Sequence, residues 1–199
     1  MIKNNAVKNS LLLLLLLGGA GSAQAEESKK NSSEAKQNTS SSAGKGESKN
    51  VEMEKLGFLT GSWNYTATHV KKDKNGKEEV ETGKFISRFG PGNNSLIIEL
   101  HGSSSQGEDV IMDLIGWDPK TKSYETITTG SSFPTFMHGK AYWNKDLFTM
   151  EINSKRNNIP SQARIIYKRI RDNEMQVEEW FQRGAEPHKH SMTMKLSKA

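Results

Sequence analysis

The sequence contains no cysteine among its 199 residues, and this absence excludes several kinds of chemistry at once. Disulfide frameworks, thiol nucleophiles, cysteine-ligated zinc and iron–sulfur clusters all require cysteine. We also expect no lipoprotein anchor, because the lipid is attached to a cysteine at the cleavage point. The fold must therefore be stabilised by its core alone.

Aromatic residues are absent from residues 1–50, so all 7 Phe, 4 Trp and 4 Tyr lie in residues 51–199. That segment has the length of one domain. It is also almost neutral, with 21 Lys and Arg against 19 Asp and Glu. Nucleic-acid binders concentrate positive charge on the domain that contacts phosphates, so this balance argues against a DNA or RNA partner.

Long hydrophobic runs are missing as well, since the longest is the seven-leucine stretch Leu11–Leu17. It is far shorter than the roughly 20 residues that span a bilayer, which makes a membrane anchor the weaker alternative. Lys3 and Lys8 precede it, and small residues lead from it into Ala23-Gln24-Ala25. This order is typical of an export signal at residues 1–25, cleaved near Ala25. We expect a periplasmic or secreted protein without a membrane span.

Residues 26–50 are rich in Ser, Lys, Glu and Asn and have almost no apolar side chains. Such a composition cannot offset the entropy lost on ordering, which predicts a disordered linker. The alternative is that its lysines contact an anionic surface, but five Lys stand against four Glu.

Residues 51–59 have near-helical spacing and predict one or two turns of helix. The rest of the domain, to residue 199, reads as ten short strands joined by turns such as Asn75-Gly76 and Gln106-Gly107. The predicted strands are 62–72, 79–89, 95–102, 110–117, 124–129, 137–143, 147–153, 163–171, 175–182 and 188–196.

Ten strands without intervening helices predict an all-β fold with an antiparallel sheet. Closure into a barrel protects the sheet edges most completely, so we expect an antiparallel barrel of about ten strands. A barrel of this size can hold a small ligand. We therefore expect the protein to bind a small, largely apolar molecule, the alternative being a barrel with a filled core. Its oligomeric state is left open.

In the first strand Trp63, Tyr65, Ala67 and His69 share one face, which we expect to point inward. Aromatic residues on several strands are candidates for lining the cavity, although the inward face of the later strands is not fixed by their pattern. The candidate ligand-binding residues are Tyr65, His69, Tyr142, Trp143 and Trp180.

Catalytic residues are not indicated by any motif, because the sequence has neither a Gly-x-Ser-x-Gly elbow nor a phosphate-binding glycine loop. Glu178 and Glu179 are adjacent on a strand, and cross-strand ion pairs on the outer face explain them most simply. Asp113 and Glu99 are better candidates for buried carboxylates. An enzyme with a barrel-interior site would depend on Asp113, His69 or His138. A protein-interaction module with a filled core also stays open.

Two motifs resemble known families. The segment Phe58-Leu59-Thr60-Gly61-Ser62-Trp63 is similar to the entry motif of calycin barrels, in which the tryptophan plugs the closed end. From about Leu56 to Leu196 the chain resembles the bacterial domain-of-unknown-function family 1579, whose central turn is matched by residues 116–124, GWDPKTKSY. The resemblance implies a lipocalin-like barrel with Gly61, Trp63, Gly116 and Asp118 as structural residues, and it implies no activity. The chain departs from the family at residues 88–92, which puts the strand register there in doubt.

His188 and His190 are two residues apart near the start of the last predicted strand, where they would share a face. They could bind a metal, or His190 could bind haem, because it is placed similarly to the haem-binding histidine of nitrobindins. The rest of the nitrobindin pattern is missing here, so we expect no cofactor, with haem or metal as the alternative.

Overall fold

The computed structural model describes residues 50–72, 76–104, 107–156 and 158–199. The expected export signal and nearly all of the expected linker lie outside these residues, as do Asn75 and Gln106 of two predicted turns. In the described part of the chain, no helix is long and apolar enough to cross a membrane.

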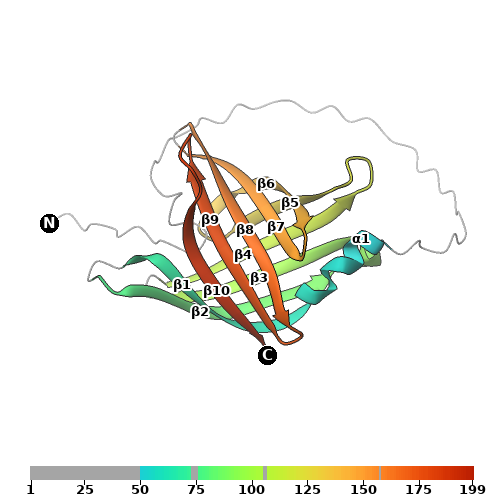
Figure 1. Ribbon diagram of the computed structural model, residues 1–199, viewed down its shortest axis with the longest axis horizontal. Coiled ribbons are helices and arrows are strands. Elements are labelled where there is room, and N and C mark those ends of the chain that lie inside the picture. Colours follow the sequence, from blue (N-terminus) through green and yellow to red (C-terminus); the bar gives the residue numbers. More distant parts are fainter. Residues whose placement is uncertain (1–49, 73–75, 105–106, 157) are drawn as a thin grey trace, which may run out of the picture.

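The described chain begins with one short helical segment and continues as strands (Figure 1). The helical elements are α1 (Val51–Glu54), η1 (Lys55–Leu59) and η2 (Pro91–Asn93). The strands are β1 (Gly61–Lys72), β2 (Glu78–Phe89), β3 (Ser95–Ser104), β4 (Gly107–Asp118), β5 (Ser123–Gly130), β6 (Phe133–Asn144), β7 (Leu147–Arg156), β8 (Ile159–Arg171), β9 (Glu174–Arg183) and β10 (Lys189–Lys198).

The ten strands form one closed antiparallel barrel in which each strand pairs with its neighbours along the chain. The barrel closes where β1 pairs with β10, from Trp63 opposite Lys198 to His69 opposite Met192. The predicted fold class, an all-β calycin-like barrel with a short N-terminal helix, is confirmed.

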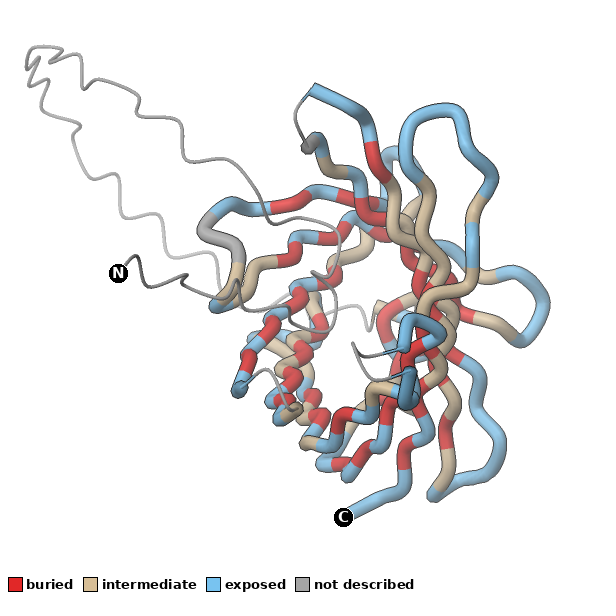
Figure 2. The backbone as a smooth tube through the Cα atoms, turned by 90° about the vertical axis from the view of Figure 1, so that its left-hand side faces the viewer, coloured by how far each residue is buried: buried red, intermediate tan, exposed pale blue. Residues whose placement is uncertain are grey.

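Buried and more exposed residues alternate along most strands, as the period of two in a β-strand requires (Figure 2). In β1 the buried residues are Trp63, Tyr65, Ala67 and His69, which confirms the predicted inward face. The fourth strand turns Ile111, Asp113 and Ile115 inward and leaves Met112 and Leu114 exposed.

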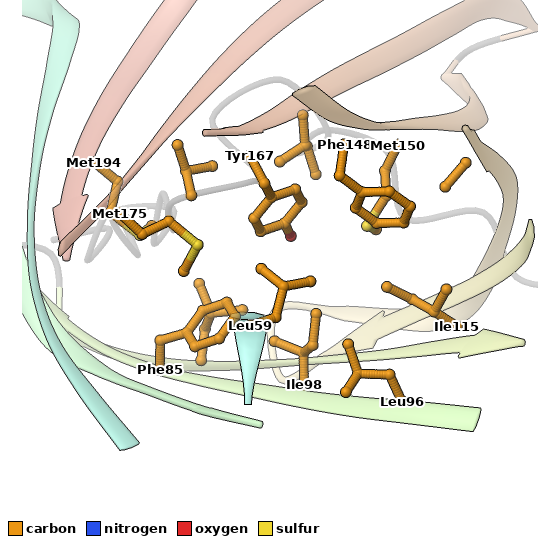
Figure 3. Close-up of a cluster of buried hydrophobic side chains, with 14 of the residues drawn as sticks. Leu59, Phe85, Leu96, Ile98, Ile115, Phe148, Met150, Tyr167, Met175 and Met194 are labelled. Carbon is orange, nitrogen blue, oxygen red and sulfur yellow. The ribbon is translucent and has the colours of Figure 1, made fainter. Parts of the chain in front are cut away.

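One end of the barrel is closed by α1 and η1, whose Met53, Leu56 and Leu59 are completely buried. Leu59 lies among core side chains that come from strands around the barrel (Figure 3). Its carbonyl oxygen accepts hydrogen bonds from Trp63 Nε1 and Ser87 Oγ, both at 3.0 Å. Trp63 therefore joins the helical segment to the barrel wall, as the calycin resemblance implied. Gly61 makes the turn between them at a φ of 117°, which side chains rarely tolerate.

The turn of the GWDPKTKSY motif, between β4 and β5, is ordered by local hydrogen bonds of Asp118. Asp118 accepts from the backbone N–H of Lys120 at 2.8 Å and from Thr121 Oγ1 at 2.9 Å. The first of these bonds is the main reason that the pKa of Asp118 lies below its usual value. The register left in doubt after the second strand is regular, with Phe89 opposite Leu96 across the turn that contains η2.

Candidate functional site

The interior changes character along the barrel axis. Near α1 it is apolar, whereas the distal half, the part away from α1 where β1 ends and β2 begins, contains acids and hydroxyl groups. Within the described residues, the buried charged side chains are four carboxylic acids and no Lys or Arg; the acids are Glu81, Asp109, Asp113 and Glu179.

Two of these acids belong to what we call the inner acidic wall, made of Tyr65, Glu81, Asp109 and Ser131. Tyr65 Oη on β1 donates a hydrogen bond to Glu81 Oε1 on β2 at 2.5 Å. On β4, Asp109 Oδ1 accepts hydrogen bonds from Ser131 Oγ and from Ser132 Oγ of the β5–β6 turn. Strand pairing thus lines up hydroxyl donors and carboxyl acceptors along one side of the interior.

Gly102 on β3 makes room for this wall. It is paired with Asp109 on β4 and with Gly83 on β2. A Cβ atom at position 102 would overlap Glu81 Oε1 and would come within 2.7 Å of Tyr65 Oη. A glycine inside a strand often marks a place where another group approaches the backbone closely, and here that group is the Tyr65–Glu81 pair.

Burial dominates the electrostatics of the wall. It raises the pKa of Glu81 to about 7; the hydrogen bond from Tyr65 opposes this effect, and the nearby Asp109 and Glu79 add to it. Burial also raises the pKa of Tyr65, which keeps its proton for donation. The pKa of His69 is lowered by burial, so this imidazole is neutral at neutral pH.

One oxygen of the wall lacks a hydrogen bond. Asp109 is 6% exposed, and its Oδ2 has no hydrogen-bond partner among the described residues. A buried acceptor without a donor costs about 1–3 kcal/mol, and more when it is charged. Buried polar atoms of this kind need an explanation such as a bound water, ion or ligand.

A second set of polar side chains lies around a small cavity in the middle of the barrel. The cavity has a volume of about 20 Å³, and its lining includes Asp113, Glu179 and Tyr167. Asp113 accepts a hydrogen bond from Thr128 Oγ1, and Glu179 Oε1 accepts one from Ser191 Oγ at 3.0 Å. This volume admits one water molecule and no organic ligand.

Burial raises the pKa values of both acids at this cavity, to about 6 for Asp113 and about 7 for Glu179. In each case a hydroxyl donor, from Thr128 or Ser191, partly opposes the effect. Glu179 Oε2 has no partner in the described part of the chain. A water in the cavity could donate to it.

The structure places the five candidate ligand-binding residues differently. Tyr65 and His69 are buried inside the barrel. Trp143 packs at the closed end, where its ring lies 5.7 Å from that of Phe58 and its Nε1 donates to Tyr124 Oη at 3.3 Å. It therefore belongs to the core around α1 and η1.

Tyr142 and Trp180 lie on the outer face, so their predicted inward orientation is wrong. In β6, Ala141 and Trp143 point inward, and Tyr142 between them is 41% exposed and donates to Glu151 Oε1. In β9, Val177 and Glu179 point inward, so Trp180 faces outward. Alternation along each strand forces both outcomes once the inward neighbours are fixed.

Of the two histidines predicted to share a face of the last strand, His188 precedes β10 and is half-buried, and His190 is the second residue of β10. An irregularity in the β9–β10 pairing between His190 and Met192 places His190 opposite Trp180 on the outer face, while Met192 is buried inside. The ring of His190 packs 5.1 Å from that of Trp180, and its Nε2 lies 3.0 Å from Thr193 Oγ1. Among the described residues no three His, Asp or Glu side chains form a metal site.

Three further residues correct the predicted acid and base positions. Glu179 is buried inside the barrel instead of pairing on the outer face. Glu99 is half-buried on the outer face beside Arg88, and His138 is exposed, so neither lies in the interior. Asp113 is buried as predicted.

The sequence pattern did not predict Glu81 and Asp109 as interior acids. Each sits in a polar stretch, Glu78–Glu81 and Glu108–Asp109, that looks solvent-exposed. The one available signal was glycine inside neighbouring strands, at Gly83 and Gly102, which leaves space on the inner face.

Comparison with known proteins places the fold. No protein-family model matches the chain, and no curated protein matches it. Among solved structures, Rv2717c from M. tuberculosis superposes with a TM-score of 0.51 at 12% identity, over 74% of this chain and 96% of that one. The barrel is calycin-like, and the likeness to Rv2717c concerns the fold alone.

Two other structures are similar at lower scores. EF1p2_mFAP2b bound to DFHBI has a TM-score of 0.39 at 15% identity, over 74% of this chain and 98% of that one. The S-type phycobiliprotein lyase CPES from Guillardia theta has a TM-score of 0.43 at 9% identity, over 76% and 97%. The likeness to family 1579 stays a resemblance in a few motifs.

Proposed function

We propose that the barrel binds a small molecule in its distal half, with an apolar body inside the barrel and a polar group against the inner acidic wall. The observation that carries this proposal is Asp109 Oδ2, a buried acceptor without a donor in the described chain, beside a second buried acid, Glu81. A ligand that donates hydrogen bonds to the wall would satisfy it. Ligand sites of proteins typically combine an apolar lining with a few polar groups that fix orientation.

The ligand must occupy the distal half because the rest of the interior is filled. Near α1 the core is packed around Leu56, Leu59 and Phe148, which are completely buried. The cavity between Asp113 and Glu179 is about 20 Å³, the size of a single water. Towards the distal half, Leu100 and Met137 face inward and are each 8% exposed. We propose that these two apolar side chains contact the ligand.

Native mass spectrometry of the full chain, purified from an exporting host, tests this function. We expect a retained extra mass that is lost when Asp109→Asn removes the charge at nearly constant shape. Asp146→Asn, in the exposed β6–β7 turn, is the matched control and should retain the mass. A bare protein mass, together with no stabilisation by any compound of a metabolite library, would contradict the proposal.

Gly102→Ala gives a second test of the same site. A methyl group at this position overlaps the carboxyl group of Glu81, so the Tyr65–Glu81 pair has to move. We expect ligand affinity to fall by about tenfold or more, the equivalent of about 1.4 kcal/mol. Gly57→Ala, where a Cβ meets no atom within 4 Å, is the control for the loss of a glycine. Equal affinities of the two variants would argue against a ligand at the wall.

We also infer that the protein is exported, from the basic, apolar and small-residue segments of residues 1–25. The intact mass of the protein recovered from an exporting host checks this. A chain that begins at Glu26 would support cleavage after Ala25, and a chain that still begins at Met1 would contradict it.

A further inference from the structure

We propose that the ligand is an organic cation whose ammonium group lies between Glu81 and Asp109. This inference rests on the proposed function and adds the chemical class of the ligand. It is argued from the charges of the wall, from the hydrogen bond that the wall lacks, and from the character of the surrounding side chains.

The charge balance of the interior favours a positive ligand. Glu81 comes from β2 and Asp109 from β4. Gly102 on β3 pairs with Asp109, and a Cβ atom at Gly102 would overlap the carboxyl group of Glu81. Each acid therefore faces the same space, and Asp109 acts electrostatically on both Glu81 and Tyr65. In the described part of the barrel no Lys or Arg is buried to compensate them. An anionic ligand would be repelled here, whereas a cation would be attracted by both carboxylates.

The missing hydrogen bond points in the same direction. The wall already has its own donors, Tyr65 Oη for Glu81 and two serine hydroxyls for Asp109 Oδ1. Asp109 Oδ2 is the atom left without a donor among the described residues, although Asp109 is only 6% exposed. An ammonium group carries several N–H donors and no acceptor, so it matches a site that offers acceptors only. Hydrogen bonds between charged partners are also roughly twice as strong as neutral ones.

The raised pKa of Glu81 couples binding of a positive charge to the release of a proton. Its pKa of about 7 means that the carboxyl group is about half protonated at neutral pH. A bound ammonium group would favour the carboxylate form, so binding should release a proton. The groups that act on Glu81 are Tyr65 on β1, Glu79 on β2 and Asp109 on β4, and Glu79 also acts on His69 of β1.

A metal ion fits this site less well than an organic cation. No cluster of three His, Asp or Glu side chains is arranged to hold a metal in the described residues. Besides His69 on β1, the inward neighbours on β1, β3 and β4 include the apolar Ala67, Leu100 and Ile111. These three apolar side chains suit the hydrocarbon part of an amine and offer nothing to a hydrated metal ion.

The test uses matched ligands of equal length, titrated into the full chain by calorimetry at pH 8. The series contains primary alkylamines of about two to ten carbons, with the corresponding alcohols and carboxylates as probes. We expect at least one amine to bind at least about tenfold more tightly than its alcohol, and the carboxylate not to bind. Equal or tighter binding of an alcohol or a carboxylate would overturn the cation and leave the proposed small-molecule function standing. If no member of the series binds, the cation inference is overturned, while a different mass retained in native spectra would still support the function.

Two charge-removing variants locate the effect. Asp109→Asn and Glu81→Gln should each weaken amine binding by about tenfold or more and leave binding of the alcohol nearly unchanged. Glu99→Gln, on the outer face of β3, is the control that should bind amines as the unmodified protein does. Circular dichroism verifies that each variant folds. Unchanged amine affinity in both wall variants would place the cation elsewhere and overturn the assignment.

The pH dependence gives a readout that a purely structural role of these acids would not produce. Because a cation binds the carboxylate form of Glu81, amine affinity should rise between about pH 6 and pH 8 and then level off. Because Glu81 is about half protonated at pH 7, calorimetry in two buffers with different ionisation enthalpies should detect about half a proton released per amine at this pH. Glu81→Gln should abolish this release. Binding without proton release in the unmodified protein would contradict the position of the ammonium group.

Discussion

At the scale of single residues, Glu179 is a carboxylic acid held in an apolar interior. It is 3% exposed, and burial raises its pKa to about 7. The folded state therefore binds a proton that the unfolded chain releases near the ordinary pKa of glutamate. As pH rises from about 4.5 to about 7, the unfolded state holds fewer protons than the folded state, so the free energy of unfolding falls. Above about pH 7 the loss is complete.

Glu179→Gln removes this penalty, because an amide stays neutral at every pH. We expect the variant to be more stable than the unmodified protein at pH 8 by up to roughly 3 kcal/mol, the equivalent of the pKa shift, and to differ little at pH 4.5. Urea unfolding at both pH values measures this. Glu178→Gln, one residue away on the outer face, should leave the pH dependence unchanged. A stability profile of Glu179→Gln that parallels the unmodified protein would contradict the buried charge.

The sequence predicted single residues well where one face of a strand is polar. In β1 the threonines at 66 and 68 oppose Tyr65 and Ala67, so the inward face was determined by composition. It could not decide between Tyr142 and Trp143, because either aromatic side chain is compatible with the core. Glu179 is harder still, since an acid in the core depends on Ser191 from another strand, and strand pairing is not visible in one sequence.

At the scale of elements, α1 and η1 act as the plug of the barrel. Leu56 and Leu59 are completely buried, and the carbonyl group of Leu59 binds Trp63 and Ser87. These hydrogen bonds tie the segment to β1 and β2, and the leucine side chains fill the end of the core. Short helices are marginal on their own, so the plug owes its stability to this packing.

Leu59→Ala tests the plug without disturbing its backbone hydrogen bonds. We expect a loss of about 2–5 kcal/mol in the free energy of unfolding, because the truncation leaves a cavity in a packed core. Val51→Ala, an exposed position in α1, should change stability by less than about 0.5 kcal/mol. Chemical denaturation of the two variants makes the comparison, and similar small losses would mean that the plug is not part of the cooperative core.

Strand and turn positions were predictable because turn residues punctuate the chain, and all ten expected strands are present. The irregular pairing at Ser191 was not predictable, since it inserts one residue between His190 and Met192 without a glycine or proline to mark it. Such a bulge changes which face a side chain occupies. It turns His190 outward and brings Ser191 Oγ to Glu179, so one local irregularity decides the face of His190 and supplies a hydrogen-bond donor to the buried acid.

At the scale of the whole molecule, the barrel is a series of hairpins with a single long-range closure. Nine of the ten pairings join consecutive strands, and the tenth joins β1 to β10. The same closure brings the C-terminus beside the first strand, where the N–H of Ala199 donates to Ser62 O at 2.9 Å. Closed sheets have no free edges, so this pairing protects β1 and β10 as well as stabilising the fold.

The importance of closure, as opposed to chain order, can be tested with two rearranged proteins. A circular permutant that links Ala199 to Asn50 by a long flexible linker and opens the exposed turn between Lys145 and Asp146 keeps every strand pair. We expect it to unfold cooperatively, with a far-ultraviolet spectrum like that of the unmodified protein. Removal of residues 189–199 deletes β10, exposes two sheet edges and uncovers the core beside Met175 and Val177, so we expect aggregation and no cooperative transition. A truncated protein that unfolds cooperatively, or a permutant that fails to fold, would show that chain order and not closure of β1 on β10 holds the barrel together.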